Sequence, residues 1–93
     1  MEVQHDETGH RFYIPLESGR EALLLYRRQG DVLDFYHTYV PEPFRGKGLA
    51  EKVVTAGFRY AKEKGLKVIP TCSYVASLVS RRKDLLPFVQ STE

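Results

Sequence analysis

The sequence predicts an α/β domain of the α+β type, with a mostly antiparallel sheet, one parallel β-α-β unit and two helices. Two observations lead to this prediction. Over the first forty residues, apolar and polar side chains alternate between short turns, a pattern typical of an antiparallel meander. From residue 48 the apolar period becomes helical, and a short apolar run then precedes a second helical pattern.

The size and composition of the chain fit a small globular protein. With 93 residues, of which 42% are hydrophobic and 28% charged, we expect a single domain over residues 1–93. One cysteine cannot form an internal disulfide, so we expect a reducing, cytoplasmic location. No apolar run approaches the roughly 20 residues of a membrane span, and we expect no membrane partner.

Four strands are predicted in the first half of the chain. The apolar runs cover residues 3–5, 12–16, 21–27 and 32–40, and turn-forming residues separate them. Pro15 cannot donate a hydrogen bond to a neighbouring strand, so the second strand is expected to lie at the sheet edge or to end there. The 32–40 run is the longest and is rich in aromatic and β-branched residues.

Two helices and one more strand are predicted in the second half. A helix over residues 48–64 would place Leu49, Val53, Ala56, Gly57, Tyr60 and Ala61 on one stripe. Gly65 is expected to end it. Residues 66–72 form a short apolar strand, and Ser73 is positioned to cap a second helix over 74–82. A helix between strands 32–40 and 66–72 makes those strands parallel neighbours.

The segment PEPFRGKGLAEK joins the longest strand to the first helix. A helix N-terminus carries unpaired N–H groups and a partial positive charge, and glycine lets a bulky anion approach that backbone closely. Arg45 and Lys47 add full charges, so the segment predicts a cradle for a phosphate or pyrophosphate. The alternative is a glycine-rich turn with two solvated cations. The segment lacks the Lys-Ser/Thr ending of a P-loop.

This segment resembles the acetyl-coenzyme A motif of the Gcn5-related N-acetyltransferases. Arg45-Gly46-Lys47-Gly48-Leu49-Ala50 fits every fixed position of Arg/Gln-x-x-Gly-x-Gly/Ala. With HTYVP (37–41) before it and CSYV (72–75) after it, residues 3–88 resemble a very small subgroup that is little more than the family core. The N-terminal helix pair that usually shapes the acceptor pocket is missing. The resemblance therefore implies an acceptor site that is open or completed by a partner chain.

The resemblance also implies a co-substrate and an activity. The co-substrate is acetyl-coenzyme A, with no metal, and the reaction is acetyl transfer to an unidentified amine, either a small molecule or a protein lysine. Pantetheine would bond to backbone at residues 38–40, and pyrophosphate to N–H groups at 46–50. The expected binding residues are Thr38, Tyr39, Val40, Arg45, Gly46, Lys47, Gly48, Leu49, Ala50, Ser73 and Tyr74. The alternative is a non-catalytic coenzyme A-binding module that acts through a protein partner.

Two residues are candidates for the chemistry. Cys72 precedes a helix N-terminus, which favours a thiolate, and the resemblance places it where the transferable acetyl group should sit. The alternative is a small core cysteine. His37 suits a general base near neutral pH, or else packs beside Leu33, Phe35 and Tyr39 on one strand face. Tyr74 could protonate the leaving coenzyme thiolate or pack under the second helix.

The charge of the chain does not point to nucleic acid. The net charge is +2, and the only notable basic run is Arg81-Arg82-Lys83. Nucleic-acid-binding domains concentrate many more basic residues on one face, so we do not expect this partner. The run is either a contact for the 3′-phosphate of coenzyme A or a solvated helix end.

Overall fold

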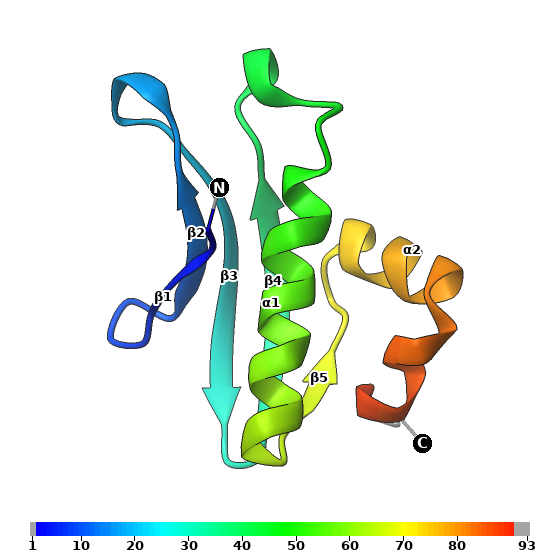
Figure 1. Cartoon of the computed structure of the whole chain (residues 1–93). Helices are drawn as coiled ribbons and strands as arrows, with labels where there is room; N and C mark the ends of the chain where they lie inside the picture. Colours follow the sequence, from blue (N-terminus) through cyan, green and yellow to red (C-terminus); the bar gives the residue numbers. More distant parts are fainter. Residues whose placement is uncertain (1, 91–93) are drawn as a thin grey trace.

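A five-stranded sheet with one long helix packed across it forms the body of the protein, as seen in a computed structural model that describes residues 2–90 (Figure 1). The strands are β1 (Gln4–Asp6), β2 (Arg11–Pro15), β3 (Glu21–Gln29), β4 (Val32–Tyr39) and β5 (Lys67–Ile69). The helices are α1 (Leu49–Lys64) and α2 (Ser73–Arg81), with 3-10 turns η1 (Glu17–Gly19), η2 (Glu42–Phe44) and η3 (Lys83–Phe88). Among these residues, no helix is long and apolar enough to cross a membrane.

The strand order follows the chain order, β1-β2-β3-β4-β5. The first four strands pair antiparallel, and β4 pairs with β5 in parallel through Val32↔Lys67 and Asp34↔Ile69. Helix α1 connects these two parallel strands, which confirms the predicted fold class. Strand β2 ends at Pro15 but lies between β1 and β3, so of the two outcomes predicted for Pro15 the strand end is the one observed.

The core lies between one face of the sheet and the helices. Alternate strand residues such as Leu24, Leu33 and Phe35 are fully buried there. Of the predicted stripe, helix α1 buries Leu49, Val53, Gly57 and Ala61, whereas Ala56 and Tyr60 are only half-buried. Val54 and Phe58, which were not predicted, are buried as well. We call the opposite side of the sheet the outer face.

Gly57 brings α1 unusually close to the sheet. A methyl group at this position would lie 2.7 Å from Phe35 Cζ and 2.9 Å from Leu24 Cδ2, closer than carbon atoms pack. The helix axis is therefore set by the absence of a side chain at one position. At the end of the same helix, Gly65 has a φ of 71° and ends α1 as predicted.

Strand β4 contains a β-bulge that reverses its side-chain alternation. Leu25 pairs with His37, but Tyr26 pairs with Phe35, so Tyr36 is an extra residue. Phe35 faces the core, and beyond the bulge Thr38 does so too, because it pairs with the buried Leu24. The prediction that His37 shares a face with Leu33 and Phe35 was therefore wrong, since it assumed an unbroken strand.

The segment after α1 also differs from the prediction. Strand β5 ends at Ile69, before Pro70, which lacks an N–H group to continue the ladder. The chain then turns, and the Cys72 N–H group donates a hydrogen bond of 2.9 Å to the Phe35 carbonyl. Cys72 is the N-cap of α2, whereas we predicted Ser73 for that position and Cys72 for the strand end.

Candidate functional site

The carboxyl end of β4 opens into a cleft of about 360 Å³ beside the start of α1. Ligands of open α/β sheets bind outside the carboxyl ends of parallel strands, and this cleft occupies that place. Nine of the predicted binding residues line it, namely Thr38, Tyr39, Val40, Arg45, Gly46, Gly48, Leu49, Ala50 and Tyr74. Lys47 and Ser73 are exposed and do not line it.

Two glycines shape the backbone at one end of the cleft. Gly46 has a φ of 81° and Gly48 has a φ of 78°, both in the left-handed region that favours glycine. A Cβ atom built on either residue would meet no other atom within 4 Å, so the space above this backbone is open. Gly48 is the N-cap of α1, and the N–H groups of the first helical turn after it have no partner within the helix. These features fit a bound phosphate.

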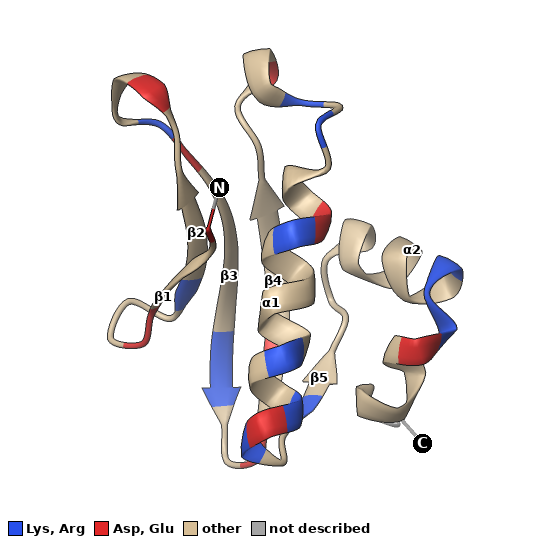
Figure 2. Ribbon diagram, viewed as in Figure 1, with Lys and Arg blue, Asp and Glu red and all other residues tan. Residues whose placement is uncertain are grey.

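Arg45 is held across the loop that leads to the helix. Its Nε atom donates a hydrogen bond of 2.8 Å to the Val40 carbonyl, so the side chain folds back toward the end of β4. Arg45 and Val40 both line the cleft, so this hydrogen bond holds a charged side chain in its wall. Basic residues mark the loop between β4 and α1 in Figure 2, and the helix dipole adds to their charge.

Two cleft residues, Phe44 and Glu51, were not predicted. The Glu51 carboxylate accepts a hydrogen bond of 2.9 Å from Arg82, which also binds Asp84 at 2.9 Å. Arg82 thus partly neutralises an acidic group beside the glycine-rich start of α1. No local pattern connects residue 51 with residue 82, so only the folded structure reveals this pair. Of the basic run at 81–83, Arg82 is engaged by these carboxylates, while Arg81 and Lys83 are exposed.

The half-buried Cys72 thiol lies at the edge of the cleft. Cys72 does not itself line the cleft, but its Sγ atom lies 3.5 Å from the Oγ1 atom of Thr38, which does. Its neighbour Tyr74 also lines the cleft. The thiol therefore lies where the predicted pantetheine-binding strand meets the start of α2.

The surroundings of Cys72 favour its ionised form. Burial raises the pKa of the thiol. The Thr38 hydroxyl and the backbone N–H groups of Val75, Tyr74 and Thr38 lower the pKa, and together they outweigh the effect of burial. The net result is a pKa below the ordinary thiol value. The side chain forms no capping hydrogen bond with α2. The N–H groups of the helix therefore act on the sulfur at longer range, as the positive end of the helix dipole.

His37 lies on the other side of β4 from Cys72. It pairs with Leu25, whose neighbours Leu24 and Tyr26 are buried, so both His37 and Leu25 are on the outer face. The imidazole is exposed. The structure brings Cys72 together with Thr38 and Tyr74 but does not bring it together with His37.

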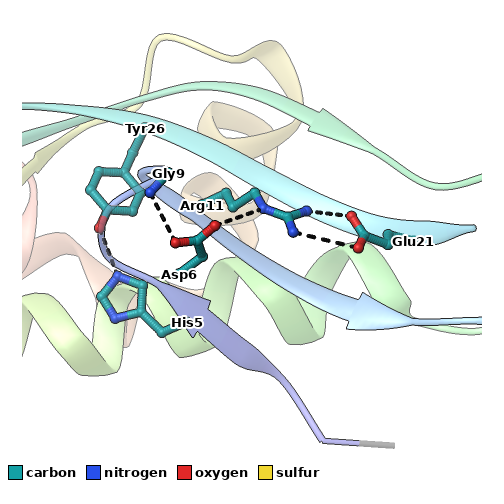
Figure 3. A network of polar contacts seen from close by, with 6 residues as sticks. All are labelled: His5, Asp6, Gly9, Arg11, Glu21 and Tyr26. Carbon is teal, nitrogen blue, oxygen red and sulfur yellow. Dashed lines mark hydrogen bonds and ion pairs between the residues drawn. The ribbon is translucent and has the colours of Figure 1, made fainter.

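A second polar cluster ties β1 to the sheet and does not line the cleft (Figure 3). His5 stacks on Phe12 at 4.0 Å, and its Nε2 atom lies 2.6 Å from the Tyr26 hydroxyl. Burial lowers the pKa of His5 and raises the pKa of Tyr26 to about 12. Arg11 bridges Asp6 and Glu21 in the same network. These contacts give His5 a structural role.

Comparison with known proteins places the whole fold in one family. A family model described as GCN5-related N-acetyltransferase matches residues 11–86. The protein NATD1 of Xenopus tropicalis is 35% identical over 81 residues, which cover 85% of this chain and 74% of that protein. The protein NATD1 of Gallus gallus is 33% identical with the same coverage.

A solved structure leads to the same family. The solution NMR structure of a GCN5-like protein from Staphylococcus aureus superimposes with a TM-score of 0.77 at 26% identity. The match covers 99% of this chain and 90% of that one. Together with the family model and the NATD1 proteins, it confirms the resemblance inferred from the glycine-rich motif and its flanks. The chain belongs to the GCN5-related N-acetyltransferase family and is an acetyltransferase.

Proposed function

We propose that this protein transfers an acetyl group from acetyl-coenzyme A to an amine through an acetyl-Cys72 intermediate. The observation that carries the proposal is the place of the thiol. Cys72 Sγ contacts Thr38, which lines a cleft that the open, positively charged N-terminus of α1 also lines. A substrate with a phosphate group at one end and a thioester at the other suits this arrangement.

Binding of the substrate is assigned to the cleft. The pyrophosphate would occupy the open space above Gly46 and Gly48 and accept hydrogen bonds from the N–H groups at the start of α1. Arg45, held by Val40, supplies a fixed positive charge beside it. The pantetheine arm would follow residues 38–40 toward the thiol, because these residues line the cleft between the cradle and Cys72.

Transfer to the enzyme begins with the ionised thiol. Cys72 loses its proton to solvent, and the thiolate attacks the carbonyl carbon of the acetyl thioester. A new carbon–sulfur bond forms at Cys72, the bond to the coenzyme sulfur breaks, and the coenzyme thiolate takes a proton from Tyr74 or from water. One thioester is exchanged for another, so this step is close to isoenergetic.

Transfer to the acceptor completes the cycle. A neutral amine attacks the carbonyl carbon of acetyl-Cys72, the Cys72 thiolate leaves, and the amine nitrogen gives up one proton. Water receives this proton in the covalent route, because His37 lies on the other side of β4 from Cys72, and His37 remains the candidate base of the alternative, direct transfer. The acceptor is an amine of a small molecule or of a protein lysine side chain.

Turnover measurements test this function against its alternative. Acetyl-coenzyme A consumption is followed with small primary amines and with lysine-containing peptides. The proposal predicts amine-dependent turnover that is lost in Cys72→Ala, whereas direct transfer predicts activity that survives in Cys72→Ala and falls by about 10²- to 10⁴-fold in His37→Gln. Coenzyme A binding with no turnover for any amine would instead favour the non-catalytic module.

A further inference from the structure

The β-bulge in β4 decides which side chain meets the Cys72 thiol. In an unbroken strand, Thr38 would alternate with the buried Leu33 and Phe35 and would face outward. The extra residue Tyr36 shifts the alternation by one, so Thr38 faces the core side instead. Its hydroxyl oxygen then lies 3.5 Å from Cys72 Sγ. The contact is therefore a consequence of the bulge.

The ionisation state of the sulfur fixes the direction of this hydrogen bond. With a neutral thiol, either the S–H group or the O–H group can be the donor. A thiolate has no proton and can only accept, so Thr38 must then donate. Threonine is β-branched and restricted at χ1, which keeps its hydroxyl beside the sulfur at little entropic cost.

We propose that Thr38 is a positioning residue for acetyl transfer, whose hydroxyl donates a hydrogen bond to the Cys72 thiolate each time that thiolate forms. This inference rests on the proposed role of Cys72 and assigns a role to the Thr38 side chain, whereas the family resemblance concerns only its backbone. Thr71, which precedes Cys72 in the sequence, cannot replace Thr38 as the donor, since the Thr71 hydroxyl donates to the Asp34 carboxylate.

The hydrogen bond acts in both halves of the reaction. Before the first step it stabilises the attacking thiolate, and it is released when the sulfur becomes acylated. In the second step the carbon–sulfur bond of acetyl-Cys72 breaks, the electron pair returns to sulfur, and the hydroxyl donates to it again. Thr38 keeps its proton throughout, so its hydrogen bond adds no reactant to the exchange in which the amine nitrogen bonds to the carbonyl carbon and the Cys72 thiolate leaves. A thiol of lower pKa is also the better leaving group.

The proposal is tested by the pH dependence of Cys72 alkylation, which requires no catalysis. Iodoacetamide reacts with the thiolate, and Cys72 is the only cysteine, so the rate reports its ionisation directly. Thr38→Val keeps the shape and removes the hydroxyl. We expect alkylation near neutral pH to slow by roughly tenfold, with the profile displaced to higher pH, as for the loss of one hydrogen bond to a charged group.

Three further variants make the result specific. Thr38→Ser restores the hydroxyl and should return the profile most of the way to that of the wild type. Thr71→Val makes the same change one residue from Cys72 and should leave the profile unchanged, because that hydroxyl bonds to Asp34. If Thr38→Val does not fold by circular dichroism, Thr38→Ala replaces it in the comparison with Thr38→Ser.

The outcomes separate this inference from the function on which it rests. The role of Thr38 would be overturned if the folded Thr38→Val or Thr38→Ala protein kept the wild-type pH profile of alkylation. It would also be overturned if the profile shifted in that variant but Thr38→Ser did not return it toward that of the wild type. If the alkylation profile of Thr38→Val is displaced but acetyl-coenzyme A does not acetylate the wild-type protein, the hydrogen bond from Thr38 is supported and the proposed function is contradicted. If Thr38→Val slows both the alkylation and the acetylation of Cys72 and leaves coenzyme A affinity unchanged, the role of Thr38 and the proposed function are both supported.

Discussion

Thr38 Oγ1 lies 3.5 Å from Cys72 Sγ, although the two residues are 34 positions apart in the sequence. The contact joins β4 to the start of α2, and both elements contribute residues to the cleft. It places a thiol of lowered pKa beside a cleft that the positively charged N-terminus of α1 also lines.

Gly48→Val should weaken coenzyme A binding by about tenfold or more, because the side chain would fill the space assigned to the pyrophosphate. Gly65→Val is the matched control, since Gly65 has a similar positive φ and open surroundings at the other end of α1. Both variants suffer the same backbone strain, but only the first should lose affinity by calorimetry. Equal affinities in the two folded variants would remove the phosphate cradle from the account.

Arg45→Ala should reduce coenzyme A affinity more at low salt than at high salt, because dissolved ions screen the lost charge. Pantetheine, which lacks the phosphates, should bind both proteins almost equally. Arg45→Lys keeps the charge but not the Nε hydrogen bond to Val40, so it should recover the salt dependence and only part of the affinity. Equal losses for pantetheine and coenzyme A would show that Arg45 serves the loop conformation alone.

Gly57→Ala should destabilise the protein by roughly 1–3 kcal/mol, because the new methyl group overlaps Phe35 and Leu24. Helix propensity alone predicts the opposite sign, a gain of up to about 1 kcal/mol. Urea unfolding measures the difference. Shortening the opposing ring in Gly57→Ala/Phe35→Leu should relieve part of the cost, and strictly additive losses would contradict the close approach.

His5 should make stability depend on pH in the weakly acidic range. Burial lowers the pKa of His5 below 6.5, against the opposing effect of Glu7 and Asp6. Below pH 6.5 the unfolded chain therefore binds more protons at this site than the folded one, and stability falls as the pH drops toward the folded pKa. His5→Gln should flatten the dependence between pH 7 and 5 in urea unfolding. An unchanged slope would show that His5 titrates alike in both states.

Much of the fold follows from local signals in the sequence. Turn residues and apolar alternation place the strands of the meander, and Gly48 and Gly65 bracket α1, because glycine adopts the left-handed conformations found there. The open, glycine-rich start of α1 could be predicted for the same reason, since its backbone geometry depends on consecutive residues. Pro70, which ends β5 early, was a local signal that could have been used.

The arrangement around the thiol could not be predicted in this way. The bulge at Tyr36 depends on the register between β3 and β4, which no local pattern reports, and it decides that Thr38 rather than His37 meets Cys72. The hydrogen bond between Glu51 and Arg82 likewise joins the start of α1 to the end of α2. Side-chain partners across elements follow from packing, so they appear only in the folded structure.

The most direct test of the account is the intact mass of the protein after incubation with acetyl-coenzyme A and no amine. We predict a gain of about 42 Da, which peptide mapping should place on Cys72. The Cys72→Ser protein should still bind coenzyme A but should show no gain in mass. A suitable amine should remove the acetyl group from the wild-type protein. Mapping is needed because lysines acetylate without an enzyme. Full amine-dependent turnover by Cys72→Ala, with no adduct on the wild-type cysteine, would contradict the covalent route.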